Sequence, residues 1–282
     1  MQKKIINVIS VIDYIEKNLF EKLNLETVSN AMHYSKYHLH HMFSETVGIT
    51  IHDYILRRKL TEAAKLLVFS DKTIIDIALI SGYESQQAFT LVFKELYKKT
   101  PNQFREQQEF YPLQLKFTLT ENPTTTQKEW GQEIVFATEQ DIPQWLNLVR
   151  LVIDGFPNLT ETAYRENLIW YIQTRQALIL KDQHLAVGIL AFQRKTGSID
   201  FFGIHPQYKD KGIANAFLKK VTAELPDKKE ISITTFRQGD KADTGYRNAL
   251  EELGFAEAEL LTEFGYPTQK MILQTGNLEH DL

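Results

Sequence analysis

The sequence predicts a multidomain chain, with an all-α N-terminal domain that holds two helix-turn-helix units and then an α/β (α+β) domain with a mixed sheet. Three observations predict this organisation. A helix-turn-helix pattern occurs twice in the first hundred residues, at 25–47 and again at 73–97. A polar stretch that contains ENPTTTQKEW follows. Beyond it, short stretches with strand and helix periodicity alternate.

Apolar spacing and end signals predict the N-terminal helices. Ser35 is a suitable N-cap for the third helix, and Gly48 is a suitable residue to end it. Gly82 marks the turn of the second copy, and Pro101 opens a short last helix from which Phe104 packs inward. The expected helices span residues 8–19, 25–32, 36–47, 51–68, 74–80 and 85–97, with the last beginning at 101.

The second helix of each copy combines an apolar stripe with a polar face. The stripe would anchor the helix in its domain and leave the polar face free to contact base edges. Because the pattern occurs twice, the sequence favours binding to double-stranded DNA.

The charge distribution predicts only modest attraction to phosphates. Residues 1–110 hold 14 Lys and Arg against 13 Asp and Glu, whereas the remainder holds 18 against 23, within a net charge of -4. Neither half is strongly basic, so binding to the DNA backbone should be modest and sensitive to salt. We expect local basic groups at helix ends to lie near phosphates, namely Arg57, Arg58, Lys59, Lys94, Lys98 and Lys99.

Composition narrows the class of protein further. The chain has no Cys, which excludes disulfides, thiolate zinc sites and thiol nucleophiles and suits a reducing cytosol. The opening MQKKIINVIS is basic, but Asn7, Ser10 and Asp13 interrupt its apolar residues, so we expect a helix there and not an export signal. No stretch approaches the roughly 20 apolar residues of a membrane span. The sequence therefore predicts a soluble, cytoplasmic protein without a membrane partner.

Four segments of the N-terminal part carry a specific family resemblance. YSKYHLHHMF, YILRRKLTEAAKLL, IIDIALISGYESQQAF and TPNQFR resemble the AraC-type regulator domain, with most similarity to its MarA, SoxS and Rob group, over about residues 5–108. The resemblance implies a monomer that lays two recognition helices into successive major-groove segments on one face of the duplex. It also makes RNA polymerase a candidate partner.

The resemblance assigns candidate DNA contacts to both recognition helices. They are Lys36, Tyr37, His40 and His41 on the first, and Gln86, Gln87, Thr90 and Lys94 on the second. Gln can form two hydrogen bonds to an adenine edge, and Thr can contact a thymine methyl group. The family often has Arg where this chain has His41 and Leu91, so we expect a different target sequence.

Plainer interpretations of the same residues stay open. Gln86 and Gln87 would also suit a solvated helix start, and Tyr34 and Tyr37 would suit a core. The histidines at 33, 38, 40 and 41 suggest a metal site, but neither a carboxylate nor a thiol completes it, so no metal is expected.

Domain boundaries follow from the loss of periodicity after residue 107. We expect the double helix-turn-helix domain at 1–108, a linker at 109–132 and the second domain at 133–282. Alternating Leu113, Leu115, Phe117 and Leu119 suggest some strand-like order inside the linker. In the second domain, strands are expected at 134–137, 177–181, 186–194, 198–204 and 230–235 and on both sides of Pro267, with helices at 142–153, 160–174, 207–225 and 245–253.

A strand-to-helix turn in the second domain is suited to anionic oxygens. In FGIHPQYKDKGIANAFLKKV, backbone N–H groups at a helix start face a loop in which Gly212 and Ala214 leave room for a diphosphate. With ALEELGF, this segment resembles the GNAT acetyl-CoA-dependent N-acetyltransferases over about residues 133–275, although Lys209 stands where the family has Arg or Gln. The resemblance implies acetyl-CoA, or another acyl-CoA, held by Phe202, Ile204, Lys209, Asp210, Lys211, Gly212, Ile213 and Ala214.

Catalytic residues are less clearly marked than cofactor residues. The resemblance places a thiolate-protonating tyrosine where this chain has Leu250, and a helix-start Asn where it has Asp243. Tyr246 lies one turn earlier and is a candidate substitute, and Asp200 is a candidate base, with a structural role open for both.

Two functional classes therefore stand for the whole chain. The favoured one is a DNA-binding transcription regulator whose GNAT-like domain senses an acyl-CoA or a small amine, with or without turnover. The alternative is an N-acetyltransferase whose N-terminal domain serves localisation or autoregulation.

Overall fold

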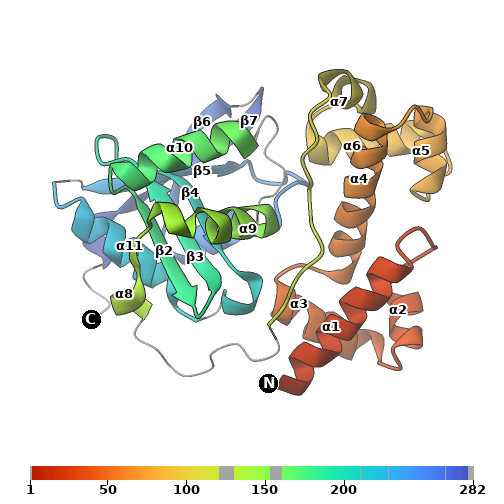
Figure 1. Ribbon diagram of the computed structural model, residues 1–282, viewed down its shortest axis with the longest axis horizontal. Coiled ribbons are helices and arrows are strands. Elements are labelled where there is room, and N and C mark those ends of the chain that lie inside the picture. Colours follow the sequence, from red (N-terminus) through yellow and green to blue (C-terminus); the bar gives the residue numbers. More distant parts are fainter. Residues whose placement is uncertain are drawn as a thin grey trace. The chain divides into compact units, whose positions relative to one another are not determined.

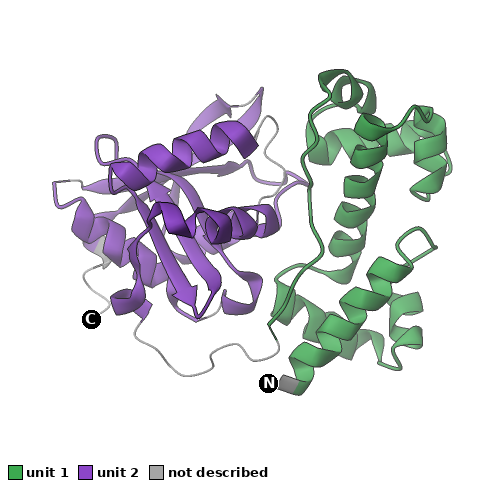
Figure 2. Cartoon of the chain, viewed as in Figure 1, with its two compact units in different colours: residues 1–123, 153–157 green, residues 124–152, 158–282 purple. Residues whose placement is uncertain are grey.

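A computed structural model describes residues 2–120, 130–152, 161–209, 211–227, 229–263 and 265–278. The chain divides into two compact units (Figure 2). The first, here called the helical unit, comprises residues 1–123 with 153–157, and the second, here called the sheet unit, comprises 124–152 and 158–282. A helical region followed by a mixed-sheet region confirms the coarse fold class predicted from the sequence.

The helical unit contains the two predicted helix-turn-helix copies, joined by a long helix (Figure 1). The first copy is α2–α3 and the second is α5–α6, and α4 connects them. The bounds are α1 Gln2–Lys17, α2 Leu25–Ala31, α3 Lys36–Val47, α4 Ile51–Phe69, α5 Ile74–Ile80, α6 Gln86–Tyr97 and α7 Pro101–Gln107. These agree with the sequence prediction within a few residues, except that α1 begins earlier.

Buried aromatic residues hold the second copy together. Phe93 stacks on Tyr97, with ring centroids 4.4 Å apart, and both rings contact Phe104 of α7. All three side chains are fully buried. Aromatic side chains bury large apolar areas, so this cluster anchors α6 and confirms the inward position predicted for Phe104.

The segment after α7 differs from the predicted linker. Residues 110–119, here called the strap, run in an extended conformation along the helical unit, and Tyr111, Leu113 and Phe117 are buried there. The structure describes no strand in this segment. Residues 121–129 lie outside the described residues, and Trp130–Glu133 form α8, which the sequence did not predict.

The sheet unit has a seven-stranded mixed sheet in the order β1-β2-β3-β4-β5-β7-β6. Its elements after α8 are β1 Val135–Phe136, α9 Ile142–Val152, α10 Glu161–Gln173, β2 Ala177–Asp182, β3 Leu185–Phe192, β4 Ser198–Ile204, α11 Ile213–Glu224, β5 Glu230–Phe236, α12 Tyr246–Glu252, β6 Ala256–Glu263 and β7 Tyr266–Gln274. Pro267, predicted to separate two strands, lies inside β7 at its first pairs with β6.

Helices pack closely against both faces of this sheet (Figure 1). A Cβ added to Gly188 of β3 would lie 2.5 Å from the Phe217 ring of α11. A Cβ added to Gly203 of β4 would lie 2.7 Å from Val152 of α9. Because these two glycines face opposite sides of the sheet, their lack of a side chain allows α11 and α9 to cover it.

The central strands β4 and β5 pair over only part of their length. Their parallel pairing consists of Ser198 with Ser232 and Ile199 with Ile233. On its other edge β4 pairs with β3 as far as Ile204. The edge of β4 that faces β5 therefore diverges after Ile199. Within the described residues, no helix is long and apolar enough to cross a membrane.

Candidate nucleic-acid interface

The recognition helix of the first copy, α3, is fixed at both ends by local signals. The Ser35 hydroxyl accepts a hydrogen bond from the His38 N–H at 3.2 Å. Gly48 ends the helix in the left-handed region, at φ 79°. Leu39, Met42, Phe43 and Val47 are buried, as the apolar stripe predicted. The opposite face of α3 therefore points away from the core.

That face carries a tyrosine beside imidazole rings. Tyr37 is 76 % exposed, so the core interpretation of this residue is wrong. Its ring lies 4.3 Å from that of His41, centroid to centroid, and His41 meets His40 edge-on. Lys36 forms an exposed ion pair with Glu26 of α2 at 3.0 Å. These groups can contact phosphates or bases by hydrogen bonding and stacking.

The recognition helix of the second copy, α6, has the same construction. The Ser85 hydroxyl accepts a hydrogen bond from the Ala88 N–H at 3.2 Å, and Lys98 ends the helix at φ 61°. Gln86 and Gln87 are exposed in its first turn, Thr90 is half-buried and Lys94 is exposed. Leu91 is 62 % exposed and lies one turn beyond Gln87. Exposure of the two glutamines is consistent both with base contact and with a solvated helix start.

Two of the residues predicted to face phosphates are instead part of the core. Arg57 and Arg58 lie in the middle of α4 and are only 3 % and 6 % exposed, so the prediction that placed them at a helix end is wrong. Arg58 donates hydrogen bonds to both carboxylate oxygens of Glu16, at 2.8 Å each, and to Glu62 at 3.0 Å. A buried guanidinium requires such acceptors, so its charge is used inside the protein.

The ion pair also affects the acid. Burial opposes the charged form of Glu16, but hydrogen bonds from Arg58 and Tyr54 outweigh it, so the pKa of this carboxyl lies below its usual value. The ionised Glu16 carboxylate therefore stabilises the folded protein at pH values above its pKa in the unfolded chain. This stabilisation is lost as the pH falls through its lower pKa in the folded protein.

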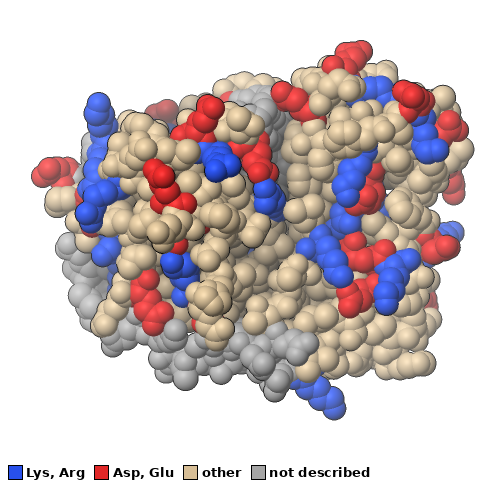
Figure 3. Space-filling view, viewed as in Figure 1, with Lys and Arg blue, Asp and Glu red and all other residues tan. Residues whose placement is uncertain are grey.

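Other predicted basic residues are engaged within the helical unit. Lys59 donates to the Glu21 carbonyl at 3.0 Å, Lys98 to the Glu95 carbonyl at 2.8 Å and Lys99 to the Gln107 side chain at 2.6 Å. Figure 3 shows basic and acidic side chains interleaved on the face of the helical unit that it presents. On this face the described residues present no purely basic surface (Figure 3), and the modest attraction to phosphates stays a prediction.

The sheet unit brings most of its predicted cofactor residues to one region. Gly212 is the N-cap of α11 at φ 72°, and a Cβ added to it would meet no atom within 4 Å. Lys209 is exposed, whereas Lys211 lies over the Tyr208 ring at 4.4 Å and burial lowers its pKa. Ile213 is buried and Ala214 packs against the core. Asp210, which was also predicted, lies outside the described residues.

The diverging edge of β4 lies beside one predicted catalytic residue. The Tyr246 hydroxyl donates to the Phe202 carbonyl at 3.3 Å, and Ile204 ends the strand. Leu250, one turn further along α12, is 1 % exposed. Asp243 accepts hydrogen bonds from the first N–H groups of α12, including that of Tyr246 at 2.9 Å. The structure thus places the Tyr246 hydroxyl against this strand, whereas Leu250 belongs to the buried core.

Asp200 has a different environment from Tyr246. Its carboxylate accepts hydrogen bonds from Gln193 at 2.5 Å, from Ser198 at 2.8 Å and from Tyr171 of α10. Burial, together with this carboxylate, raises the pKa of Tyr171. Three donors therefore orient the Asp200 carboxylate, and its role as a base stays a prediction.

The helical unit matches known regulators. A helix-turn-helix domain family matches residues 28–107. Probable transcription factor PqrA of Proteus vulgaris is 38% identical over 108 residues, which cover 38% of this chain and 87% of that relative. Multiple antibiotic resistance protein MarA of Escherichia coli is 41% identical over 100 residues, covering 36% of this chain and 79% of MarA. The chain belongs to the AraC family. It is a sequence-specific DNA-binding transcription regulator.

Two further comparisons cover only part of a relative or have low identity. The uncharacterized regulator YbfP of Bacillus subtilis is 42% identical over 94 residues, and this AraC-family chain spans 32% of its length. An acetyltransferase of the GNAT family from Bacillus cereus is 14% identical, with a TM-score of 0.40, covering 50% of this chain and 95% of that structure. That likeness carries no argument about activity.

Sequence reasoning missed one group of residues in this AraC-family regulator. These are the buried strap residues Tyr111, which contacts Tyr97 of α6, Phe117, which contacts Tyr54 of α4, and Leu113. Their apolar character was a usable signal, because a solvated linker does not need three large apolar side chains within seven residues.

Proposed function

We propose that this regulator binds DNA by placing α3 and α6 in successive major-groove segments on one face of the duplex. The observation that carries the proposal is that two 12-residue helices, each capped by a serine, both expose a polar face over a buried apolar stripe. On α6 the exposed amides of Gln86 and Gln87 suit base edges, and Lys94 suits a phosphate. On α3 the corresponding surface is Tyr37, His40 and His41, beside Lys36.

The experiment that tests this proposal is selection of bound sequences from random duplexes, followed by gel shifts with the full chain. We expect enrichment of a site with two conserved segments about one helical turn, roughly 34 Å, apart. We also expect one chain per duplex, because both recognition helices belong to one polypeptide. Failure to enrich any sequence, or enrichment of a single short segment, would contradict this arrangement.

We further propose that the sheet unit binds acetyl-CoA or another acyl-CoA as a sensor. The support is the divergence of β4 from β5 after Ile199, which leaves the Phe202 N–H and the backbone groups of Ile204 unpaired with β5 and suited to bond an amide-containing chain. The Phe202 carbonyl accepts a hydrogen bond from Tyr246. At the start of α11, Gly212 leaves space that a phosphate can occupy near helix N–H groups. Bound acyl-CoA would supply an activated acyl thioester.

Turnover would require a proton donor to the leaving thiolate, and Tyr246 is the residue nearest to that role. Its hydroxyl contacts β4 through the Phe202 carbonyl. The position one turn later is a buried Leu250, which has no proton to give. The sensor function is therefore favoured over an N-acetyltransferase that acts on a small amine.

Two measurements test the second proposal. Calorimetry with acetyl-CoA should show binding that Gly212→Ala weakens, because the new Cβ enters the phosphate space. Gly265→Ala is the matched control, since Gly265 has a similar φ of 82° and also has nothing within 4 Å of an added Cβ. Release of free thiol with a panel of polyamines and aminoglycosides should be negligible. Robust release would favour the acetyltransferase, and absence of binding would reject both.

A further inference from the structure

We propose that the strap, residues 110–119, is a positioning element that sets the spacing at which α3 and α6 contact DNA. The proposal rests on the proposed two-segment binding to DNA. It assigns a role to a segment that lies outside the matched helix-turn-helix domain, residues 28–107. The strap has three attachments, each to a different part of the helical unit.

The first attachment joins the strap to the second copy. The Tyr111 hydroxyl donates to the Tyr97 carbonyl at 3.3 Å, and the Tyr97 hydroxyl donates to the Tyr111 carbonyl at 3.3 Å. The Tyr111 ring also lies 5.3 Å from the rings of Tyr97 and Phe104, measured between centroids. Tyr97 is the last residue of α6, so this end of the strap is bound directly to a recognition helix.

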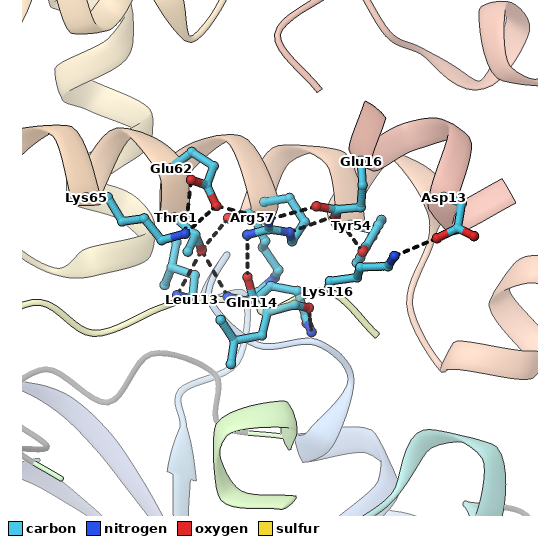
Figure 4. A network of polar contacts seen from close by, with 12 residues as sticks. Asp13, Glu16, Tyr54, Arg57, Thr61, Glu62, Lys65, Leu113, Gln114 and Lys116 are labelled. Carbon is cyan, nitrogen blue, oxygen red and sulfur yellow. Dashed lines mark hydrogen bonds and ion pairs between the residues drawn. The ribbon is translucent and has the colours of Figure 1, made fainter. Parts of the chain in front are cut away.

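The second attachment is to the middle of α4 (Figure 4). The Thr61 hydroxyl oxygen accepts hydrogen bonds from the N–H groups of Leu113 and Gln114, at 3.1 and 3.2 Å. Arg58 donates to the Gln114 carbonyl at 3.1 Å, while it also holds Glu16 of α1. Because Thr61 is fully buried, water cannot easily replace its hydroxyl, and without that hydroxyl the two strap N–H groups would lose their acceptor.

The third attachment joins the strap to the first turn of α4 and to α1, which both pack against α3 of the first copy. The Phe117 ring stacks on Tyr54 with centroids 5.3 Å apart, and Tyr54 in turn contacts Phe43 of α3 at 5.7 Å. Lys116 forms an ion pair with Asp13 of α1 at 2.5 Å. The chain of contacts from α6 through the strap therefore reaches the core side of α3.

These attachments restrain the two copies beyond the covalent link through α4. A hinge at either end of α4 would change the distance between the recognition helices unless another element opposed it. Movement of the second copy along the strap would break the paired tyrosines, and movement of the first copy together with α1 would break the ion pair between Lys116 and Asp13. Two-segment DNA binding needs a fixed distance between recognition helices, because adjacent groove segments are about one helical turn apart.

The test compares variants of the full chain on three duplexes. One has the selected two-segment site, one has a base pair inserted between the segments, and one has a single intact segment. Thr61→Val removes the hydroxyl that holds the strap, while it nearly preserves side-chain volume. Thr46→Val is the matched control, because Thr46 is also buried on a helix and also donates to a carbonyl four residues earlier, but bonds no strap residue among the described residues. Thr61→Ser restores the hydroxyl.

We expect the wild type to prefer the native spacing and Thr61→Val to reduce that preference by at least about fivefold, the scale of a single hydrogen bond, because both strap bonds to the hydroxyl are lost. Affinity for the single segment should not change, and Thr46→Val and Thr61→Ser should behave as the wild type. Hydrogen exchange at the Leu113 and Gln114 amides should become faster in Thr61→Val. If those amides are released and the spacing preference persists, the proposal is overturned.

A second variant keeps the test decisive. If Thr61→Val leaves the two amides protected, the same measurements are made on Phe117→Ala, with its unfolding midpoint recorded to show that the helical unit is folded. An unchanged spacing preference in that variant also overturns the proposal. A wild type that shows no spacing preference would instead reject the two-segment mode of binding itself.

Discussion

The helices α3 and α6 each have 12 residues, each follows a serine whose hydroxyl accepts a backbone hydrogen bond, and each ends at a residue with positive φ. Their exposed faces nevertheless carry different chemical groups. The α3 face has phenol and imidazole rings in mutual contact, whereas the α6 face has two amides, a methyl-bearing hydroxyl and an exposed leucine.

This difference separates what builds the helices from what selects DNA. The buried stripes and serine caps are equivalent, so they determine that both copies form. The exposed residues are not equivalent, and amides distinguish base edges more sharply than rings that also contact phosphates. We therefore expect α6 to contribute more to sequence discrimination than α3. The following experiments first test the shared frame, meaning the core around α4 on which both copies depend, and then the differences between the two exposed faces.

Removing the buried guanidinium should have the largest effect, because both copies depend on the frame around α4. Arg58→Ala leaves the Glu16 carboxylate without its main partner. Because the Arg58 side chain is only 8 % exposed, this ion pair is buried and water cannot easily replace the lost guanidinium. We expect the free energy of unfolding to fall by about 3–5 kcal/mol. Urea unfolding measures the change, with Lys4→Ala, which removes an exposed ion pair with Glu45, as a control that should have a much smaller effect. Equal losses in the two variants would show that the pair does not support the frame.

Substitution of an α6 amide should change specificity more than stability. We expect Gln86→Ala to relax preference at one base pair and to cost about 1–3 kcal/mol of discrimination. Gel shifts on duplexes varied at each position measure this. Lys94→Ala is the contrast, because loss of a phosphate contact should weaken all sequences alike. If Gln86→Ala keeps full discrimination, Gln86 belongs to a solvated helix start.

Much of this frame could be predicted from the sequence, because its signals are local. Ser35 and Gly48 mark the ends of α3 through their own backbone and side-chain preferences, and the apolar spacing identifies the buried stripe. The same reasoning located the exposed face with Tyr37 and Gln86. Exposure follows from helix periodicity, whereas the identity of the contacted bases depends on how the helix enters the groove.

The parts that were missed depend on non-local contacts. Arginine is usually a surface residue, so the sequence favoured exposure of Arg58. Its burial depends on the central position of α4 and on Glu16, which only the folded arrangement places beside it. Tyr111 and Phe117 follow no helical spacing, so their burial depends on Tyr97 and Tyr54, which are distant in the chain. In the sheet unit, the contact between Tyr246 and β4 likewise follows from packing.

A matched pair of cap variants sharpens the claim that the two copies are built alike. Ser35→Ala and Ser85→Ala each remove the acceptor of a 3.2 Å hydrogen bond at the start of a recognition helix. Each should reduce the free energy of unfolding by about 1 kcal/mol. Denaturant unfolding of the two variants side by side gives the comparison. A clearly larger loss at one site would mean that the copies differ in stability as well as in surface chemistry.

The smallest expected effect concerns Leu91, which occupies the position of His41 in α3 and is aliphatic where that helix has an imidazole. Leu91 is 62 % exposed on the face that carries Gln87, so we expect it to contact a thymine methyl group in the major groove. Replacing that thymine by uracil removes one methyl group and should weaken binding by about 0.8 kcal/mol. In Leu91→Ala the same replacement should have almost no effect, because the apolar partner is gone. Competition gel shifts with thymine and uracil duplexes for both proteins complete the cycle. A penalty of equal size in both proteins would assign the methyl contact to another residue, with Thr90 the next candidate on this face.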